Sequence, residues 1–218
     1  MTDQPTVQSP LVVVPIRSLG PGHRQRIADH LKALEPEDRY LRFGYAARDE
    51  HIDAYVDKID FDRDDIFGIY NRKLELIAMA HLAYSQDPEM QSCAEFGVSV
   101  LRKARGKGFG QRLFERAVMH ARNEGVDMLF VHALSENRAM LHIARKAGAE
   151  VQHMGSEADA YLKLPPATFD TRIAEMVEEQ VAQTDYRLKQ QAQRFWSFLS
   201  GVQEVRQGVR DGRHKSGS

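Results

Sequence analysis

The sequence contains one cysteine, no long apolar run and no excess of either charge. Cys93 is the only cysteine among 218 residues, which excludes an internal disulfide framework and a cysteine-rich zinc site and favours a reducing compartment, the cytoplasm. No stretch reaches the roughly 18 apolar residues of a membrane span, and the first residues carry no basic and apolar secretion signal. With 30 Lys and Arg against 31 Asp and Glu, the formal net charge is -1, so charge gives no reason to expect a nucleic-acid partner.

Two common phosphate-binding motifs are missing as well. Gly-Lys followed by Ser or Thr occurs nowhere, which excludes a Walker loop. The dinucleotide fingerprint requires a third glycine where this chain has Gln111, and the acidic residue that would hold a ribose, Asp127, comes before its strand. The histidines show no His-Glu-x-x-His or similar spacing, so we expect no metal site.

The segment 94–125 instead combines a strand, a glycine-rich loop and a helix. Val98 and Val100 alternate with small residues as in a half-buried strand, and apolar residues recur at helical spacing from Leu113 onward. Between them, three glycines spaced two apart allow the backbone to turn sharply and to bring its N–H groups close to a ligand. The following helix adds unpaired N–H groups and the positive end of its dipole. The segment therefore predicts a binding site for phosphate oxygens.

Two motifs resemble those of the GNAT N-acetyltransferases. Arg105-x-x-Gly108-x-Gly110 after a Val-x-Val strand resembles the acyl-CoA pyrophosphate loop of that family. A second family motif caps a helix beside the thioester, and the residues that fall on it are Asn137, Met140, Ile143 and Gly148. The resemblance covers about residues 10–165 and is greatest to the acetyltransferase module of bacterial protein-lysine acetyltransferases, whose acyl-CoA-synthetase-like part has no counterpart in this sequence. The shared segments are Leu34-x-Pro36-x-x-Arg39-Tyr-Leu-Arg-Phe43, Ile59-Asp-Phe-Asp-Arg63, Ala94-Glu-Phe96 and Asn137-x-x-Met-Leu-x-Ile-Ala144.

The resemblance implies an α/β (α+β) GNAT fold, in which helices flank a mixed, mostly antiparallel central sheet. The predicted strands are 11–16, 66–70, 74–84, 94–101, 128–134 and one or two in 150–164, broken at Gly155. The predicted helices are 23–34, 49–59, 111–125 and 137–147, with 35–43 as a linker. The expected organisation is a flexible leader at 1–9, a GNAT domain at 10–165, a long amphipathic helical extension at 166–210 and a disordered tail at 211–218.

The segment after Pro165-Pro166 has the composition of one long helix. No proline occurs between 169 and 209, although Gly201 offers a place for a break. Forty helical residues reach about 60 Å, which is longer than the preceding domain. Its apolar stripe consists of Ile173, Val177, Val181, Leu188, Phe195, Trp196, Phe198, Leu199, Val202, Val205 and Val209. The stripe can fold back on the domain, or it can serve self-association or partner docking. Membrane attachment is a third alternative, which the mixture of charges of both signs on the polar face disfavours.

The resemblance also implies roles for individual site residues. Glu95 corresponds to the general base, with a surface salt bridge as the alternative. The backbone of Val98 would polarise the thioester carbonyl, and Val100 would pair with the pantetheine amides. Asn137 would hydrogen-bond the CoA arm or simply cap its helix. The residues expected to hold the pyrophosphate are Arg105, Gly106, Lys107, Gly108, Phe109, Gly110 and Gln111, and those expected near the 3′-phosphate, or else in solvent, are Arg102, Lys103 and Lys107.

Two features depart from simple expectations. Ala144 stands where many GNAT enzymes carry the tyrosine that protonates the leaving thiolate, and His142 points elsewhere on a helix, so the general acid stays open. The run 60–65 begins like a calcium-binding loop, but Asp65 and Asn71 occupy the places of its required glycine and glutamate. As a hypothesis, carboxylates of this run face the acceptor pocket and favour a cationic amine.

The resulting functional hypothesis is a cytoplasmic, acetyl-CoA-dependent N-acetyltransferase that transfers the acetyl group directly to an amine. A protein lysine is the favoured acceptor, and a small amine or amino acid is the alternative. Two other classes stay open: a non-catalytic acyl-CoA sensor that signals through its C-terminal helix, and an assembly protein in which helix 169–209 binds a second copy or another partner.

Overall fold

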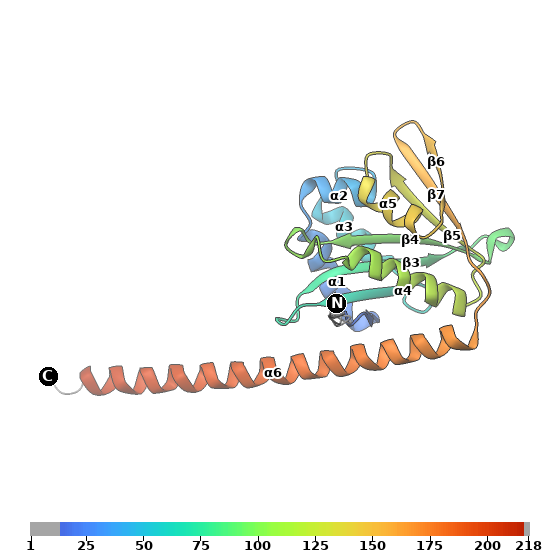
Figure 1. Cartoon of the computed structure of the whole chain (residues 1–218). Helices are drawn as coiled ribbons and strands as arrows, with labels where there is room; N and C mark the ends of the chain where they lie inside the picture. Colours follow the sequence, from blue (N-terminus) through green and yellow to red (C-terminus); the bar gives the residue numbers. More distant parts are fainter. Residues whose placement is uncertain (1–13, 216–218) are drawn as a thin grey trace, which may run out of the picture.

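The computed structural model describes residues 14–215, and of Glu89, Ala192 and residues 194–215 it describes the backbone alone. A seven-stranded sheet in the order β1-β2-β3-β4-β5-β7-β6 carries helices on both faces, and one long helix runs past the domain (Figure 1). The strands are β1 (Arg17–Ser18), β2 (Asp65–Tyr70), β3 (Leu76–Tyr84), β4 (Cys93–Val100), β5 (Met128–Leu134), β6 (Glu150–Met154) and β7 (Glu157–Lys163). The helices are α1 (Arg24–Lys32), α2 (Pro36–Phe43), α3 (Asp49–Asp57), α4 (Phe109–Asn123), α5 (Arg138–Lys146) and α6 (Phe169–Lys215).

Alternation along β4 separates the two layers of the core. Phe96 points toward α4, where its ring meets Phe114 edge to face with centroids 4.9 Å apart. Ser99 points toward α1, and its hydroxyl lies 2.8 Å from Nε2 of the buried His30. The other ring nitrogen of His30 lies 2.8 Å from the carbonyl of Leu76. Burial lowers the pKa of His30 to about 4, so this histidine is a neutral, satisfied core residue.

The central feature for function is a gap between β4 and β5. These strands are parallel neighbours, but they pair only at Cys93 with Met128, Ala94 with Leu129 and Glu95 with Phe130. Beyond Glu95 they separate, while β5 continues its antiparallel pairing with β7 over its whole length. All other strand pairs are antiparallel, which confirms the predicted mixed, mostly antiparallel sheet.

Several predicted boundaries were wrong. The predicted strand 11–16 lies mostly outside the described residues, its described part is not strand, and β1 follows it at Arg17–Ser18. The predicted linker 35–43 is the helix α2, which begins with Pro36 in its first turn and ends at Gly44 in the left-handed conformation, φ 78°. Strand β3 starts at Leu76 instead of 74, because Leu74 has a positive φ of 59° in the preceding turn.

The long helix α6 is unbroken at Gly201 and continues to Lys215, past its predicted end at 210. The described part of the predicted disordered tail, 211–215, is therefore helical, whereas 216–218 and the predicted leader 1–9 lie outside the described residues. The predicted apolar stripe does not fold back on the domain in its described part: Ile173, Val177, Val181 and Leu188 are exposed. No helix in the described range 14–215 is long and apolar enough to cross a membrane.

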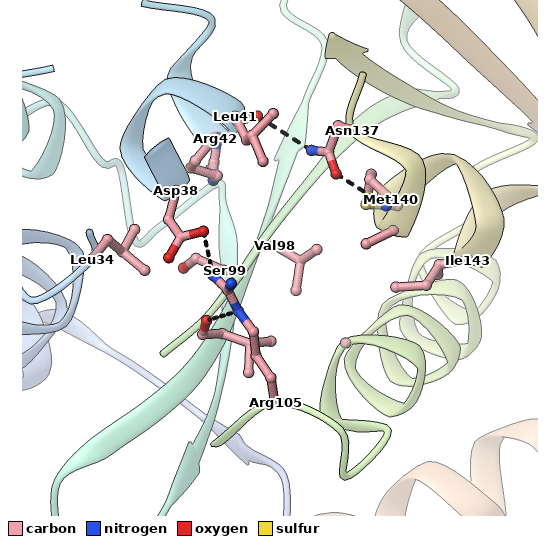
Figure 2. Close-up of a pocket in the computed structure, with 13 residues that line it drawn as sticks. Leu34, Asp38, Leu41, Arg42, Val98, Ser99, Arg105, Asn137, Met140 and Ile143 are labelled. Carbon is pink, nitrogen blue, oxygen red and sulfur yellow. Dashed lines mark hydrogen bonds and ion pairs between the residues drawn. The ribbon is translucent and has the colours of Figure 1, made fainter. Parts of the chain in front are cut away.

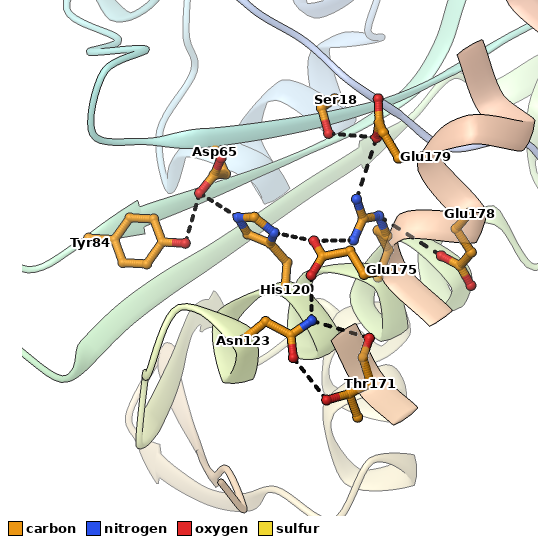
Figure 3. A network of polar contacts seen from close by, with 10 residues as sticks. Ser18, Asp65, Tyr84, His120, Asn123, Thr171, Glu175, Glu178 and Glu179 are labelled. Carbon is orange, nitrogen blue, oxygen red and sulfur yellow. Dashed lines mark hydrogen bonds and ion pairs between the residues drawn. The ribbon is translucent and has the colours of Figure 1, made fainter. Parts of the chain in front are cut away.

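The polar face of α6 is the one that packs on the domain (Figure 3). Helix α4 presents the buried Arg116, whose guanidinium contacts Glu175 at 2.6 Å and Glu179 at 3.5 Å. His120, one turn further along α4, lies between Glu175 and Asp65, the latter at 2.8 Å. Ala182 and Tyr186 supply the buried apolar anchors. Further members of this network are Ser18, Tyr84, Asn123 and Thr171.

Candidate active site

A cavity of about 220 Å³ lies between β4, α2 and α5 (Figure 2). Its lining comes from α2, β4, the start of α4 and α5, and we call it the donor pocket. The lining residues are Leu34, Asp38, Leu41, Arg42, Val98, Ser99, Val100, Arg105, Gly110, Asn137, Ala139, Met140 and Ile143. Apolar side chains and backbone dominate this list, which suits a long, flexible ligand arm held in an extended conformation.

The glycine-rich loop lies at one end of the donor pocket. Gly106 and Gly108 have φ values of 75° and 73°, a left-handed conformation that favours glycine. Gly108 is also the N-terminal cap of α4, so the N–H groups of the first helical turn point toward the loop. A Cβ atom on Gly110 would lie 3.1 Å from Cδ1 of Ile143, so this glycine lets α4 approach α5 closely. The junction is an anion-binding geometry at the mouth of the pocket.

The structure brings together only some of the predicted CoA-contacting residues as pocket lining. Val98, Val100, Arg105, Gly110 and Asn137 line the donor pocket. The others, which form the loop and the first helical turn outside that lining, are Gly106, Lys107, Gly108, Phe109 and Gln111. Of these, Phe109 packs against the core, and the Gln111 amide donates to Glu115 at 2.9 Å.

Three of the basic side chains near the loop already have partners. The guanidinium of Arg105 forms an ion pair with Asp38, and its Nε donates to the Val100 carbonyl at 3.4 Å (Figure 2). Arg102 pairs with Glu35 at 2.8 Å, and Lys103 pairs with Glu75 at 2.6 Å. The free anion donors of the loop are therefore its backbone N–H groups and the exposed side chain of Lys107, which forms no ion pair with the residues whose side chains the structure describes.

A second cavity of about 310 Å³ adjoins the first, and we call it the acceptor pocket. Glu95 and Glu157 line it from β4 and from the start of β7. At the same edge, Asp159 lies 2.6 Å from His132. The hydrogen bond to Asp159 raises the pKa of His132, and the charges of Glu157 and Glu95 add to this effect. The lining therefore combines two carboxylates, which attract a cationic group, with the guanidinium of Arg42.

The two pockets share five lining residues. They are Leu41, Arg42, Val98, Asn137 and Met140. Arg42 is the charged member of this set, and its guanidinium lies against Gly97. A Cβ atom built on Gly97 would lie 2.5 Å from Nη2 of Arg42, so only glycine allows this close approach. A positive charge is thus placed where the donor and acceptor pockets meet.

A buried hydrogen-bonded chain holds Arg42 in this position. Its Nη2 donates to the Tyr55 hydroxyl at 3.0 Å, and that oxygen lies 2.5 Å from Nδ1 of His81. Asp64 follows, with its carboxylate 3.2 Å from Nε2 of the same ring. Burial, and then the charge of Arg42, lower the pKa of His81, which favours a neutral ring whose Nδ1 accepts a hydrogen bond from the Tyr55 hydroxyl. Sequence reasoning missed this chain, because its members come from four separate segments.

Three further residues singled out in the sequence are Asn137, Ala144 and His142. The side chain of Asn137 caps α5 by accepting from the Met140 N–H at 3.2 Å, and it also donates to the Leu41 carbonyl at 3.3 Å. Ala144 is fully buried in the core, and His142 is exposed; neither lines a pocket described above.

The acidic run 60–65 was wrongly expected to face the acceptor pocket. None of its carboxylates lines either pocket. Asp60 instead accepts from the backbone of Asp62, Asp64 faces His81, and Asp65 faces His120. Among the residues whose side chains the structure describes, no group of three or more His, Cys, Asp or Glu converges into a candidate metal site.

A sequence model of the Acetyltransferase (GNAT) family matches residues 29–149, which is more than half of the chain. The chain belongs to the GNAT acetyltransferase family. The matched segment runs from α1 to the end of α5 and so contains the donor pocket, the glycine-rich loop and Glu95.

Solved GNAT structures share this fold. The GNAT domain of S. lividans PAT is 18% identical over 68% of this chain and 89% of that chain, with a TM-score of 0.58. Ribosomal-protein-alanine N-acetyltransferase from Brucella melitensis is 16% identical over 68% of this chain and 99% of that chain, with a TM-score of 0.56. Spermidine N-acetyltransferase from Vibrio cholerae, in complex with CoA and spermine, is 17% identical over 68% of this chain and 94% of that chain, with a TM-score of 0.54. Beyond the fold, identities this low carry no functional detail.

Proposed function

We propose that this protein is an acetyl-CoA-dependent N-acetyltransferase that transfers the acetyl group directly to a cationic amine, with a protein lysine as the favoured acceptor. The observation that carries the proposal is the meeting of two pockets at a shared wall, with the anion-binding loop on one side and two carboxylates on the other. Both substrates can occupy such a site together, so no covalent enzyme intermediate is needed. A cytoplasmic location is part of the proposal and rests on the single cysteine.

The donor pocket suits acetyl-CoA as substrate. The pyrophosphate would lie on the N–H groups of residues 105–111, and the pantetheine arm would follow Val98 and Val100 along the exposed edge of β4. This places the thioester at the shared wall of the two pockets. The side chain of Asn137 serves as the cap of α5 and contributes to that wall.

The acceptor amine must lose its proton before it attacks. An unperturbed lysine, with a pKa of about 10.4, is neutral at pH 7 in only about one molecule in 2,500, which corresponds to roughly 4.6 kcal/mol. Glu95 lies at the last position where β4 pairs with β5, at the edge of the acceptor pocket, and we assign it the role of general base, directly or through a water. Glu157 adds charge that attracts the cationic amine.

Arg42 stabilises the negative charge that develops during acetyl transfer. The thioester oxygen becomes an oxyanion, and the CoA sulfur then leaves as a thiolate. A preorganised guanidinium at the shared wall stabilises both charges. A thiol with a pKa near 8.5 leaves readily as the thiolate, so no tyrosine is needed at Ala144 to protonate it. The guanidinium of Arg42 further stabilises this thiolate.

The acceptor side favours a protein over a small amine. Glu95 is exposed and also lines a third cavity, of about 310 Å³. Its lining is mostly apolar and includes Met90 and Phe130. An acceptor that reaches past Glu95 therefore finds a hollow for flanking side chains.

The test is release of free CoA thiol from acetyl-CoA over a panel of lysine peptides, polyamines and amino acids. We expect amine-dependent release by the parent and a loss of about 100-fold in Glu95→Gln, the order expected for removing a general base, with acetyl-CoA binding unchanged. Glu150→Gln, an exposed carboxylate on β6 that lines neither pocket, is the matched control and should retain full activity. Acetyl-CoA binding without release for any amine would contradict the proposal and favour the acyl-CoA sensor.

A further inference from the structure

Helix α6 exposes an apolar stripe opposite the face by which it is docked. Lys189 donates to the Tyr70 carbonyl at 3.0 Å on the docked side, and beyond this point the helix runs out past the domain (Figure 1). On the opposite side, Val177, Val181 and Leu188 are 56%, 42% and 61% exposed. Contiguous apolar residues on a helix surface rarely stay in contact with water.

The stripe continues as a heptad pattern in the sequence. Starting from Val177, steps of four and three residues alternate up to Val209. Of the ten positions, eight are apolar: Val177, Val181, Leu188, Phe195, Phe198, Val202, Val205 and Val209; the other two are Thr184 and Gln191. A repeat of 3.5 residues is the pattern of a coiled-coil seam, whereas docking on a globular domain gives a period of 3.6. The seam spans about 50 Å of helix.

The projecting part of α6 requires a second helix. A lone helix in water is marginal even when its sequence favours helix, and most helical stability comes from packing of an apolar face. Each copy of the chain supplies one complete seam of the same length. A two-fold symmetric pair of α6 helices therefore buries both seams at once and leaves neither exposed.

The charges of α6 select the orientation of this pair. Residues 169–193 contain five acidic and three basic side chains, whereas 194–215 contain two acidic and five basic ones. An antiparallel pair sets the acidic half of each helix against the basic half of the other, and a parallel pair sets like against like. We propose that α6 forms an antiparallel two-stranded coiled coil with α6 of a second copy of this chain.

The geometry of the domain permits this dimer. The docked residues Glu175, Glu179, Ala182 and Tyr186 lie on the face of α6 opposite the seam, so the seam is open to a partner while the domain stays in place. Antiparallel pairing that brings Val177 opposite Val209 of the second copy places the two domains at opposite ends of the coiled coil. Neither catalytic pocket touches α6, so each site remains accessible.

The first test is the solution mass of the full chain by light scattering after size exclusion. We expect twice the chain mass of 24.8 kDa for the parent and the monomer mass for the double variant Val181→Asp/Leu188→Asp. Both positions are exposed, so the variant should fold and retain CoA release. Met176→Asp is the matched control, because it removes an equally exposed apolar side chain that lies outside the seam, and it should remain a dimer.

Disulfide crosslinking tests the orientation on a Cys93→Ser background. An antiparallel pair predicts that Val177→Cys and Val209→Cys chains crosslink when mixed and that neither crosslinks alone. Crosslinking of Val177→Cys with itself would overturn the antiparallel arrangement. A monomeric parent overturns the dimer, and sedimentation of that monomer with phosphatidylglycerol vesicles would assign the stripe to a membrane surface instead.

Discussion

Protonation of His120 is expected to make the docking of α6 dependent on pH. Burial alone would lower the pKa of this histidine, but hydrogen bonds to Asp65 and Glu175 raise it to about 9. Because this folded value exceeds the unfolded value of 6.5, the stabilisation is complete below pH 6.5 and is lost as the pH rises through about 9. The shift corresponds to about 3 kcal/mol.

The pKa of Glu175 reflects the same interaction with His120. Burial alone would raise the pKa of Glu175, but hydrogen bonds from His120, Asn123 and Arg116 lower it to about 2. Its contribution is therefore present above pH 4.5 and lost as the pH falls through about 2. The two shifts describe one interaction, so their energies are not added. The docked helix is expected to be most stable between about pH 4.5 and 6.5.

The assay is urea unfolding of the parent and His120→Asn at pH 6, 8 and 10, with NMR titration of the imidazole in the parent. We expect the variant to be less stable by about 3 kcal/mol at pH 6 and the difference to approach zero at pH 10. His142→Asn, at an exposed histidine outside the network, should match the parent throughout. A His120 imidazole that titrates near 6.5, or a stability difference that does not change with pH, would refute this reasoning.

Three further predictions concern the catalytic pockets. Arg42→Gln should lower kcat by about 100-fold, and Tyr55→Phe should lower it by less. Both should leave the KM for acetyl-CoA unchanged, because charge stabilisation is lost without loss of donor binding. Arg48→Gln, at an exposed arginine before α3, is the control, and an equal loss of kcat in it would contradict the role assigned to Arg42. Gly97→Ala should reduce kcat similarly, since the new Cβ displaces the guanidinium, and full activity would contradict the close contact. Glu157→Gln should raise the KM for cationic amines at low salt only, and a KM independent of salt would argue against electrostatic attraction.

Local sequence patterns were sufficient to predict the glycine-rich turn before α4 and the cap of α5. The glycines of the loop between β4 and α4, and the cap at Asn137, act over a few residues, so their spacing fixes their geometry. Helix α2 was missed even though its two signals are in the sequence: Pro36 stands in the first turn, and Gly44 ends the helix. A short segment with few apolar residues does not show a clear helical period, so periodicity alone favours a linker there.

Long-range pairing could not be predicted in the same way. The chain from Arg42 through Tyr55 and His81 to Asp64 joins α2, α3, β3 and the loop before β2, and no sequence spacing relates these segments.

An apolar helix stripe usually faces the core, but α6 packs on the domain through its polar face. Arg116 and His120 of α4 place two cationic groups on the docking surface, and buried charges require partners. Glu175 and Glu179 satisfy them, so the polar face docks and the apolar stripe remains exposed.

The most direct measurement is a crystal structure of the protein with acetyl-CoA. The account predicts the pyrophosphate on the backbone of the loop at 105–110 and the thioester at the shared wall, between Val98 and the guanidinium of Arg42, with the acetyl group facing Glu95. Acetyl-CoA bound elsewhere, or a thioester remote from both Arg42 and Glu95, would contradict it.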